Sequence, residues 1–137
     1  EYKKNYGWPI ASYGDLYGHQ IEEEFDSNDY YYLKNHLENG FEEPIFSFVP
    51  SIGMSQIIRV PDTFSKKWQN NFLVTSLNGG SIYRVLFDKD FSKLIYLEKI
   101  FIGDRIRDIE YSKELNTFIL ALEGNGGSIG ILKNLTE

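Results

Sequence analysis

Residues 71–87 read NFLVTSLNGGSIYRVLF, and this stretch decides the fold class. Its first part, 71–77, is rich in the β-branched and aromatic residues that favour strands. The Asn-Gly-Gly at 78–80 follows directly, and these residues adopt the backbone angles that tight turns need. Residues 81–87 then return to apolar side chains with polar ones between them. The stretch therefore predicts two antiparallel strands joined by a short turn.

Outward from this hairpin, strand-like runs continue in both directions, separated by polar turns. The other predicted strands are 44–49, 56–60, 94–102, 106–111, 117–122 and 128–132. One helix is expected over 29–39, where Gly40 can end it. No helical segment alternates with the strands, which disfavours a parallel sheet with crossover helices. The sequence predicts an all-β fold.

The predicted strands form groups of about four, one over 44–102 and the next from 105 onward. This is the rhythm of a β-propeller blade of about 40–50 residues, although periodicity by itself supports a sandwich nearly as well. We expect a loop-rich acidic segment over 1–43 and β-structure over 44–137. Between Glu22 and Glu43 there are eight acidic residues and one base. Their spacing does not fit a calcium-binding loop, so a solvated loop is favoured.

Composition excludes several classes of protein. The 137 residues fit one domain, and the absence of cysteine excludes disulfides and thiolate chemistry. Only two histidines occur, which disfavours a histidine-rich metal site. A net charge of −6 argues against nucleic acid as a partner. No apolar run is long enough for a membrane span. The chain opens on Glu1 without methionine, so we expect part of something longer or a trimmed sequence.

Short strings in a fixed order point to a known family. They are NYGWP at 5–9, FVPSI at 48–52, NFLVTSL at 71–77, GSIYRV at 80–85 and DRIRDI at 104–109. The ordered set resembles the C-terminal third of the glucose/sorbosone dehydrogenase family, the soluble aldose sugar dehydrogenases that depend on pyrroloquinoline quinone (PQQ). The resemblance covers nearly the whole chain.

The resemblance implies a six-bladed β-propeller of which this chain supplies about two blades. It also implies that PQQ and calcium lie on the central axis, with an aldose sugar above the cofactor. In this family a histidine from an earlier blade acts as base while hydride passes from C1 of the sugar to the quinone. Neither His19 nor His36 lies in a matching string, so we assign no catalytic or metal-binding residue to this chain. Alone it is expected to be inactive, and relatives often work in the periplasm.

Arg105 and Arg107 match the cofactor-contacting arginine pair of the family. At i and i+2 on one strand they would share a face, and guanidinium groups suit the three carboxylates of PQQ. The alternative is a structural ion pair with a nearby acid: Asp104, Asp108 or Glu110. Asn78 stands where the family commonly has lysine, which would weaken binding of an anionic cofactor. The same residue fits simple turn chemistry.

Phe48 matches a position where the family often has an aromatic residue near the sugar. It could stack on a sugar ring, while burial in the propeller is the alternative. Glu123 stands where relatives often have aspartate, and the sequence assigns it no role. Two open blade edges would favour self-association. A second hypothesis is a non-catalytic β-propeller or sandwich module that binds carbohydrate or a protein.

Overall fold

The computed structural model describes residues 3–14 and 32–135. It divides the chain into two compact units, Glu1–Ser51 and Ile52–Glu137. The described part of the first unit is built of loops, with one 3-10 turn, η1 (Leu37–Asn39), and an isolated parallel bridge between Ala11 and Leu33. All the strands found in the described residues belong to the second unit.

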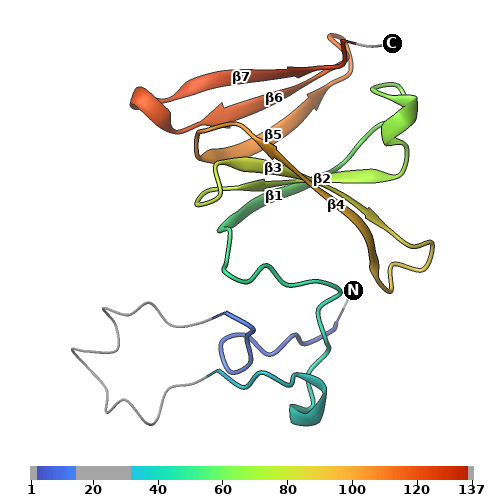
Figure 1. Ribbon diagram of the computed structural model, residues 1–137, viewed down its shortest axis with the longest axis vertical. Coiled ribbons are helices and arrows are strands. Elements are labelled where there is room, and N and C mark those ends of the chain that lie inside the picture. The colour runs from blue at the N-terminus through green and yellow to red at the C-terminus, as the bar shows by residue number, and fades with distance from the viewer. Residues whose placement is uncertain (1–2, 15–31, 136–137) are drawn as a thin grey trace. The chain divides into compact units, whose positions relative to one another are not determined.

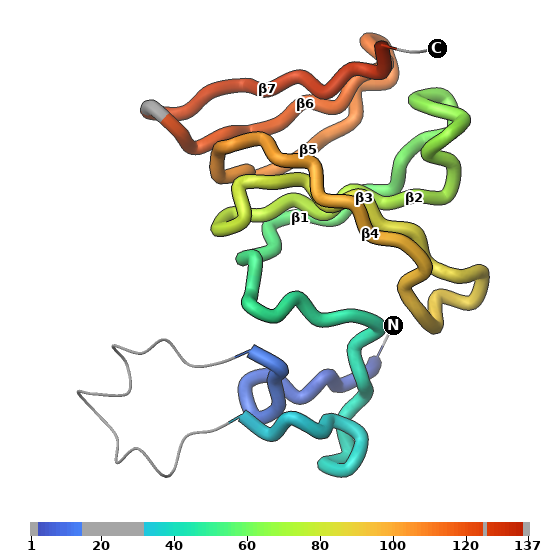
Figure 2. The backbone as a smooth tube through the Cα atoms, viewed as in Figure 1, coloured from blue at the N-terminus to red at the C-terminus, as the bar shows by residue number. Residues whose placement is uncertain are grey.

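The second unit consists of two antiparallel sheets, shown in Figure 1. The strands are β1 (Met54–Arg59), β2 (Asn71–Ser76), β3 (Ser81–Phe87), β4 (Leu94–Phe101), β5 (Ile106–Ser112), β6 (Thr117–Leu122) and β7 (Ser128–Lys133). The first sheet has the order β1-β2-β3-β4 and the second has the order β5-β6-β7. Neighbouring strands follow one another in the chain, so both sheets are simple meanders (Figure 2). The predicted all-β class is confirmed, and every strand expected after residue 55 is present.

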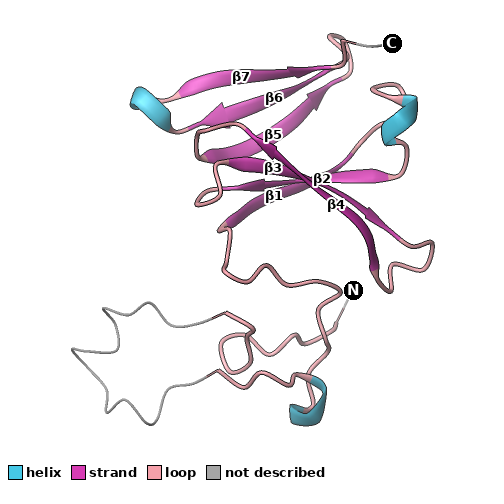
Figure 3. Ribbon diagram, viewed as in Figure 1, coloured by secondary structure: helices cyan, strands magenta, loops and turns pink. Residues whose placement is uncertain are grey.

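Two local predictions differ from the structure. Residues 44–49 form no strand, because prolines stand at 44 and 50 and a proline cannot donate to a strand ladder. Of the helix expected over 29–39, residues 29–31 lie outside the described part, and the rest contains only η1 (Figure 3). Gly40 ends this turn in the left-handed conformation, with φ of 78°, as its position predicts.

One hydrophobic core joins the two sheets. The first sheet and its flanking loops contribute Val60, Phe64, Leu73 and Ile82, and the second contributes Ile106, Ile109, Phe118 and Leu120. Leu73, Ile82, Ile106 and Phe118 are completely buried. Because the core draws on both sheets, they fold together as one unit.

The two sheets repeat the same local plan at the start of their first strands. The pairing of β1 with β2 slips between Met54 and Gln56, and that of β5 with β6 slips between Ile106 and Asp108. Each slip leaves one extra residue, Ser55 in the first sheet and Arg107 in the second, as in a β-bulge. Just before the strands, Gly53 and Arg105 each accept a backbone hydrogen bond, from Leu77 and from Glu123. The hydroxyl of Ser55 donates to the carbonyl of Ile106 at 2.6 Å and ties the sheets together.

Candidate functional site

Arg105 and Arg107 converge on one carboxylate. Nε of Arg105 donates to Oε2 of Glu123 at 2.7 Å, and Nη2 of Arg107 lies 2.9 Å from the same oxygen. About half of each arginine side chain is exposed, 47% for Arg105 and 53% for Arg107. We call these three residues the Arg–Glu cluster. The predicted shared side of the two arginines is present, but their acidic partner is Glu123 rather than Asp104, Asp108 or Glu110.

The backbone explains why these side chains meet. Arg105 immediately precedes β5, Arg107 is the extra residue of the bulge, and Glu123 follows the last residue of β6. The amide of Glu123 donates to the carbonyl of Arg105 at 2.9 Å, so the two residues face each other across the pair of strands. Bulges re-aim side chains next to functional sites, and this one brings Arg107 to the carboxylate that Arg105 already holds.

The β2–β3 turn, which contains Asn78, lies beside the loop from β4 to β5 (Figure 1). The carbonyl of Gly80 accepts hydrogen bonds from the amides of Ile102 and Gly103 at 3.0 Å each, which ties the β2–β3 turn to the loop that leads into Arg105. Gly79 has no room for a side chain, since a Cβ there would lie 2.7 Å from Oγ of Ser76. Glycine is therefore required at position 79 of the turn, and Asn78 is exposed at its tip.

Electrostatics favour an anion at the Arg–Glu cluster. Hydrogen bonds from Arg105 and then Arg107 hold the pKa of Glu123 below its usual value, so the carboxylate is charged at neutral pH. Within the cluster two positive charges face the one negative charge of Glu123, and the Asp104 carboxylate lies next to it, against the amide of Arg105. Guanidinium N–H groups not directed at Glu123 can each bind a planar carboxylate.

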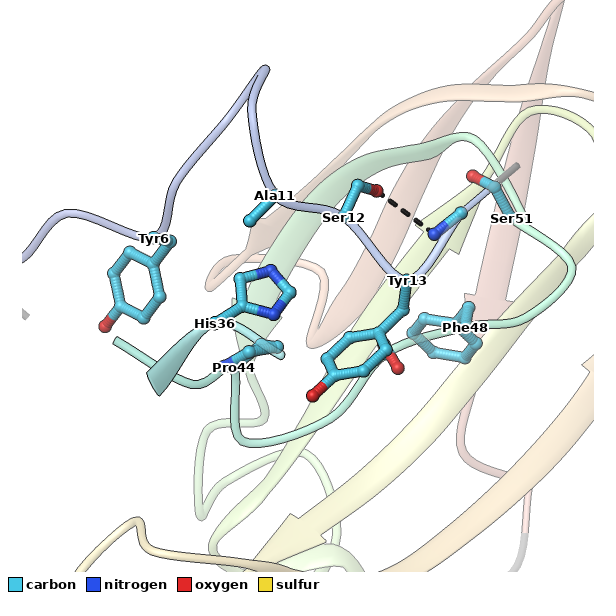
Figure 4. A pocket seen from close by; sticks show the side chains of 10 residues that line it. Tyr6, Ala11, Ser12, Tyr13, His36, Pro44, Phe48 and Ser51 are labelled. Carbon is cyan, nitrogen blue, oxygen red and sulfur yellow. Dashed lines mark hydrogen bonds between the residues drawn. The ribbon is translucent and has the colours of Figure 1, made fainter. Parts of the chain in front are cut away.

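Phe48 lies in a different place, a pocket of the first unit with a volume of about 270 Å³. Figure 4 shows the rings of Tyr6, Tyr13 and Phe48 arranged in this pocket with His36 among them. Phe48 is half-buried, and its ring meets Phe46 edge-on with 5.0 Å between centroids. Phe48 thus combines packing with a position in a pocket wall.

A buried histidine and an exposed acid organise this pocket. The hydroxyl of Tyr13 donates to Oε2 of Glu43 at 2.6 Å, and the amide of Leu37 donates to Oε1 at 3.0 Å. His36 is 3% exposed and stacks against the Tyr13 ring at 4.8 Å between centroids. Its Nδ1 has no hydrogen-bond partner among the described residues and lies 3.7 Å from Oε2 of Glu43.

Comparison with known proteins identifies the family. The family model for glucose/sorbosone dehydrogenase matches residues 1–132. The chain belongs to the glucose/sorbosone dehydrogenase family. No curated protein sequence matches it significantly.

Solved structures share the fold of this dehydrogenase-family chain. A crystal structure of a glucose dehydrogenase superposes with a TM-score of 0.72 at 23% identity, covering 97% of this chain and 36% of that one. A second glucose dehydrogenase gives 0.69 at 21% identity, covering 98% and 35%. The apo form of the soluble aldose sugar dehydrogenase from Escherichia coli gives 0.69 at 22% identity, covering 93% and 34%. The chain thus spans about a third of the length of these structures.

PQQ and calcium are the cofactors that the family implies, so the described residues are compared with what each would need. The Arg–Glu cluster offers two half-exposed guanidiniums that approach one point, which is a donor set suited to a carboxylated group. Residues 3–14 and 32–135 contain no group of three or more acidic or histidine side chains suited to a metal ion. The same residues include no helix long and apolar enough to cross a membrane.

Sequence reasoning missed three residues of these sites. The sequence assigns Glu123 no role, although its position just after β6, across from Arg105, is a usable signal once strand pairing is known. His36 and Glu43 come from the segment interpreted as helix and solvated loop. Their proximity depends on the irregular path of the chain between them, which periodicity does not predict.

Proposed function

We propose that the whole protein is a PQQ- and calcium-dependent aldose sugar dehydrogenase that oxidises a sugar at C1, and that this chain alone is inactive. The observation that carries the proposal is the meeting of Arg105 and Arg107 at one end of the second unit, in a chain of this family. The chain spans about a third of the related structures, so the base and the calcium ligands are expected in the remainder of the whole protein.

In this proposal Arg105 and Arg107 bind carboxylates of PQQ, because a guanidinium forms paired, charge-assisted hydrogen bonds with a carboxylate. Asn78 adds a neutral donor and acceptor on the neighbouring turn, where lysine would add charge. PQQ, when bound, supplies a quinone that accepts hydride. The role of this chain is to hold and orient that group.

Phe48 is proposed to contact the sugar. Its half-buried ring offers a flat apolar surface in the wall of a pocket, and the apolar face of a sugar packs on such rings. Relatives with this fold often work in the periplasm, and we propose a periplasmic or secreted location for the whole protein.

The test is titration of this chain, and of the whole protein, with PQQ and calcium, followed by a measurement of dye reduction with glucose. In the whole protein, we expect the double variant Arg105→Ala/Arg107→Ala to weaken PQQ binding by at least tenfold, because each lost charge-assisted hydrogen bond contributes about 1.5–3 kcal/mol. Arg59→Ala is the matched control, since Arg59 lies at the other end of β1 and binds Asn70. Unchanged affinity in the double variant would remove the cofactor role from both arginines.

A second candidate is a non-catalytic module that binds carbohydrate or a protein. Asn78 favours it, because the position lacks the positive charge that the family commonly has there. Absence of any PQQ binding in the same titration would support this candidate. Binding without dye reduction would instead support an inactive part of a dehydrogenase.

A further inference from the structure

The Arg–Glu cluster brings two like charges close together. Arg105 and Arg107 carry like charges two residues apart, and two exposed guanidiniums repel each other unless an anion lies between them. Glu123 supplies this anion from the end of the paired strand, with both arginines on its single oxygen Oε2. Long exposed side chains otherwise sample many rotamers.

The backbone that carries the Glu123 carboxylate is held in place by its neighbours. Glu123 donates its amide to the carbonyl of Arg105, and Asp104 accepts the amide of Arg105 through Oδ1 at 2.8 Å. Gly124 follows at once, and a Cβ there would collide with the Asp104 carboxylate. The backbone on both sides of Glu123 is therefore held in place, while its side chain is 40% exposed and is bound by the two guanidiniums.

Each guanidinium keeps donors for a ligand. Arg105 directs only Nε and Arg107 only one Nη toward Glu123 among the described residues. The remaining N–H groups lie on side chains that are half exposed. An incoming carboxylate can thus be bound without removing Glu123.

We propose that Glu123 is a positioning residue: it gathers the two guanidiniums so that their remaining donors receive one carboxylated ligand together. The inference rests on the proposed function, because it takes PQQ as that ligand. The opposite role would be competition, in which Glu123 occupies the arginines and the cofactor must displace it. The two roles predict different affinities for suitably chosen variants.

The experiment compares Glu123→Gln with Glu123→Met. Both remove the same negative charge and keep a similar length, but only glutamine retains an oxygen that accepts from the arginines. We expect PQQ to bind the methionine variant about tenfold more weakly than the glutamine variant, because two disordered arginines must then be ordered on binding. Binding is measured by equilibrium dialysis, and unfolding by urea verifies that both variants are folded. Glu110→Gln is the control, since it removes the same charge from β5 outside the cluster.

A second readout needs no cofactor. In NMR spectra of the unliganded protein, the Nε–H of Arg105 should exchange slowly in wild type and in Glu123→Gln, and rapidly in Glu123→Met. Equal PQQ affinity of the two variants, or tighter binding by Glu123→Met than by Glu123→Gln, would overturn the positioning role while leaving the proposed function intact. Failure of wild type to bind PQQ would instead overturn the proposed function.

Discussion

Phe118 has the largest fully buried side chain of the second unit, and it packs between residues of both sheets. Its ring contacts Phe64 at 4.8 Å and Tyr111 at 5.2 Å between centroids. Phe118→Ala should lower the free energy of unfolding by about 3–5 kcal/mol, because it loses buried apolar area and leaves a cavity. Urea denaturation measures this. The control Leu115→Ala, at a site 65% exposed, should change the free energy by only about 0.5 kcal/mol.

Tyr13 should show the effect of Glu43 directly. The hydrogen bond to the Glu43 carboxylate favours the protonated phenol and raises the pKa of Tyr13 above 10.0. Any contribution of this raised pKa to stability is present below pH 10 and is lost as the pH rises through the raised value. Glu43→Gln should move the Tyr13 pKa back toward 10. An NMR titration of labelled tyrosine measures this pKa. The control Glu42→Gln removes the same charge from the preceding residue, which pairs with Lys4, and should leave the pKa of Tyr13 unchanged.

The junction between sheets depends on Ser55. Its hydroxyl lies 2.6 Å from the carbonyl of Ile106 and 2.9 Å from Oγ1 of Thr75, so one side chain connects β1, β2 and β5. Ser55→Ala should cost about 1 kcal/mol of unfolding free energy or somewhat more, since a partly buried carbonyl loses its donor. The matched change Ser128→Ala, at the exposed start of β7, should cost much less. Equal losses in the two variants would show that the junction does not depend on this hydroxyl.

The edge strands β4 and β7 offer surfaces through which the chain can associate. Within the described residues β4 pairs only with β3, and β7 only with β6. Their exposed side chains include Ile95 and Phe101 on β4, and Ile129 and Ile131 on β7. Exposed apolar edges favour pairing with another chain. We propose that the chain self-associates through these edges.

This proposal predicts sedimentation above the monomer mass of 15.9 kDa. Ile129→Lys and Ile131→Lys together should shift the chain toward monomer, because charged side chains protect an edge strand. Lys89 lies in the β3–β4 turn, away from the edge of β7, so Lys89→Glu serves as a charge-changing control. A wild-type chain that sediments as a clean monomer and melts cooperatively would contradict self-association.

The strands of the second unit could be predicted from local chemistry. In residues 71–87 strand formers flank an Asn-Gly-Gly turn, and the resulting hairpin pairs Thr75 with Ile82 as a tight turn dictates. These strands are determined by the sequence because they involve neighbours along the chain. The meeting of Arg105 and Arg107 is not, because Arg105 precedes β5 and Arg107 is the extra residue of a bulge, which breaks the alternation of period two.

Only the tertiary structure decided the partners of those residues. Glu123 meets the arginines because β6 returns beside β5 and a bulge re-aims Arg107. His36 and Glu43 approach Tyr13 through an irregular chain path, and 44–49 lacks the strand that its apolar side chains favoured. Contacts between distant residues depend on register, bulges and packing, and no period of two or of 3.6 residues carries that information.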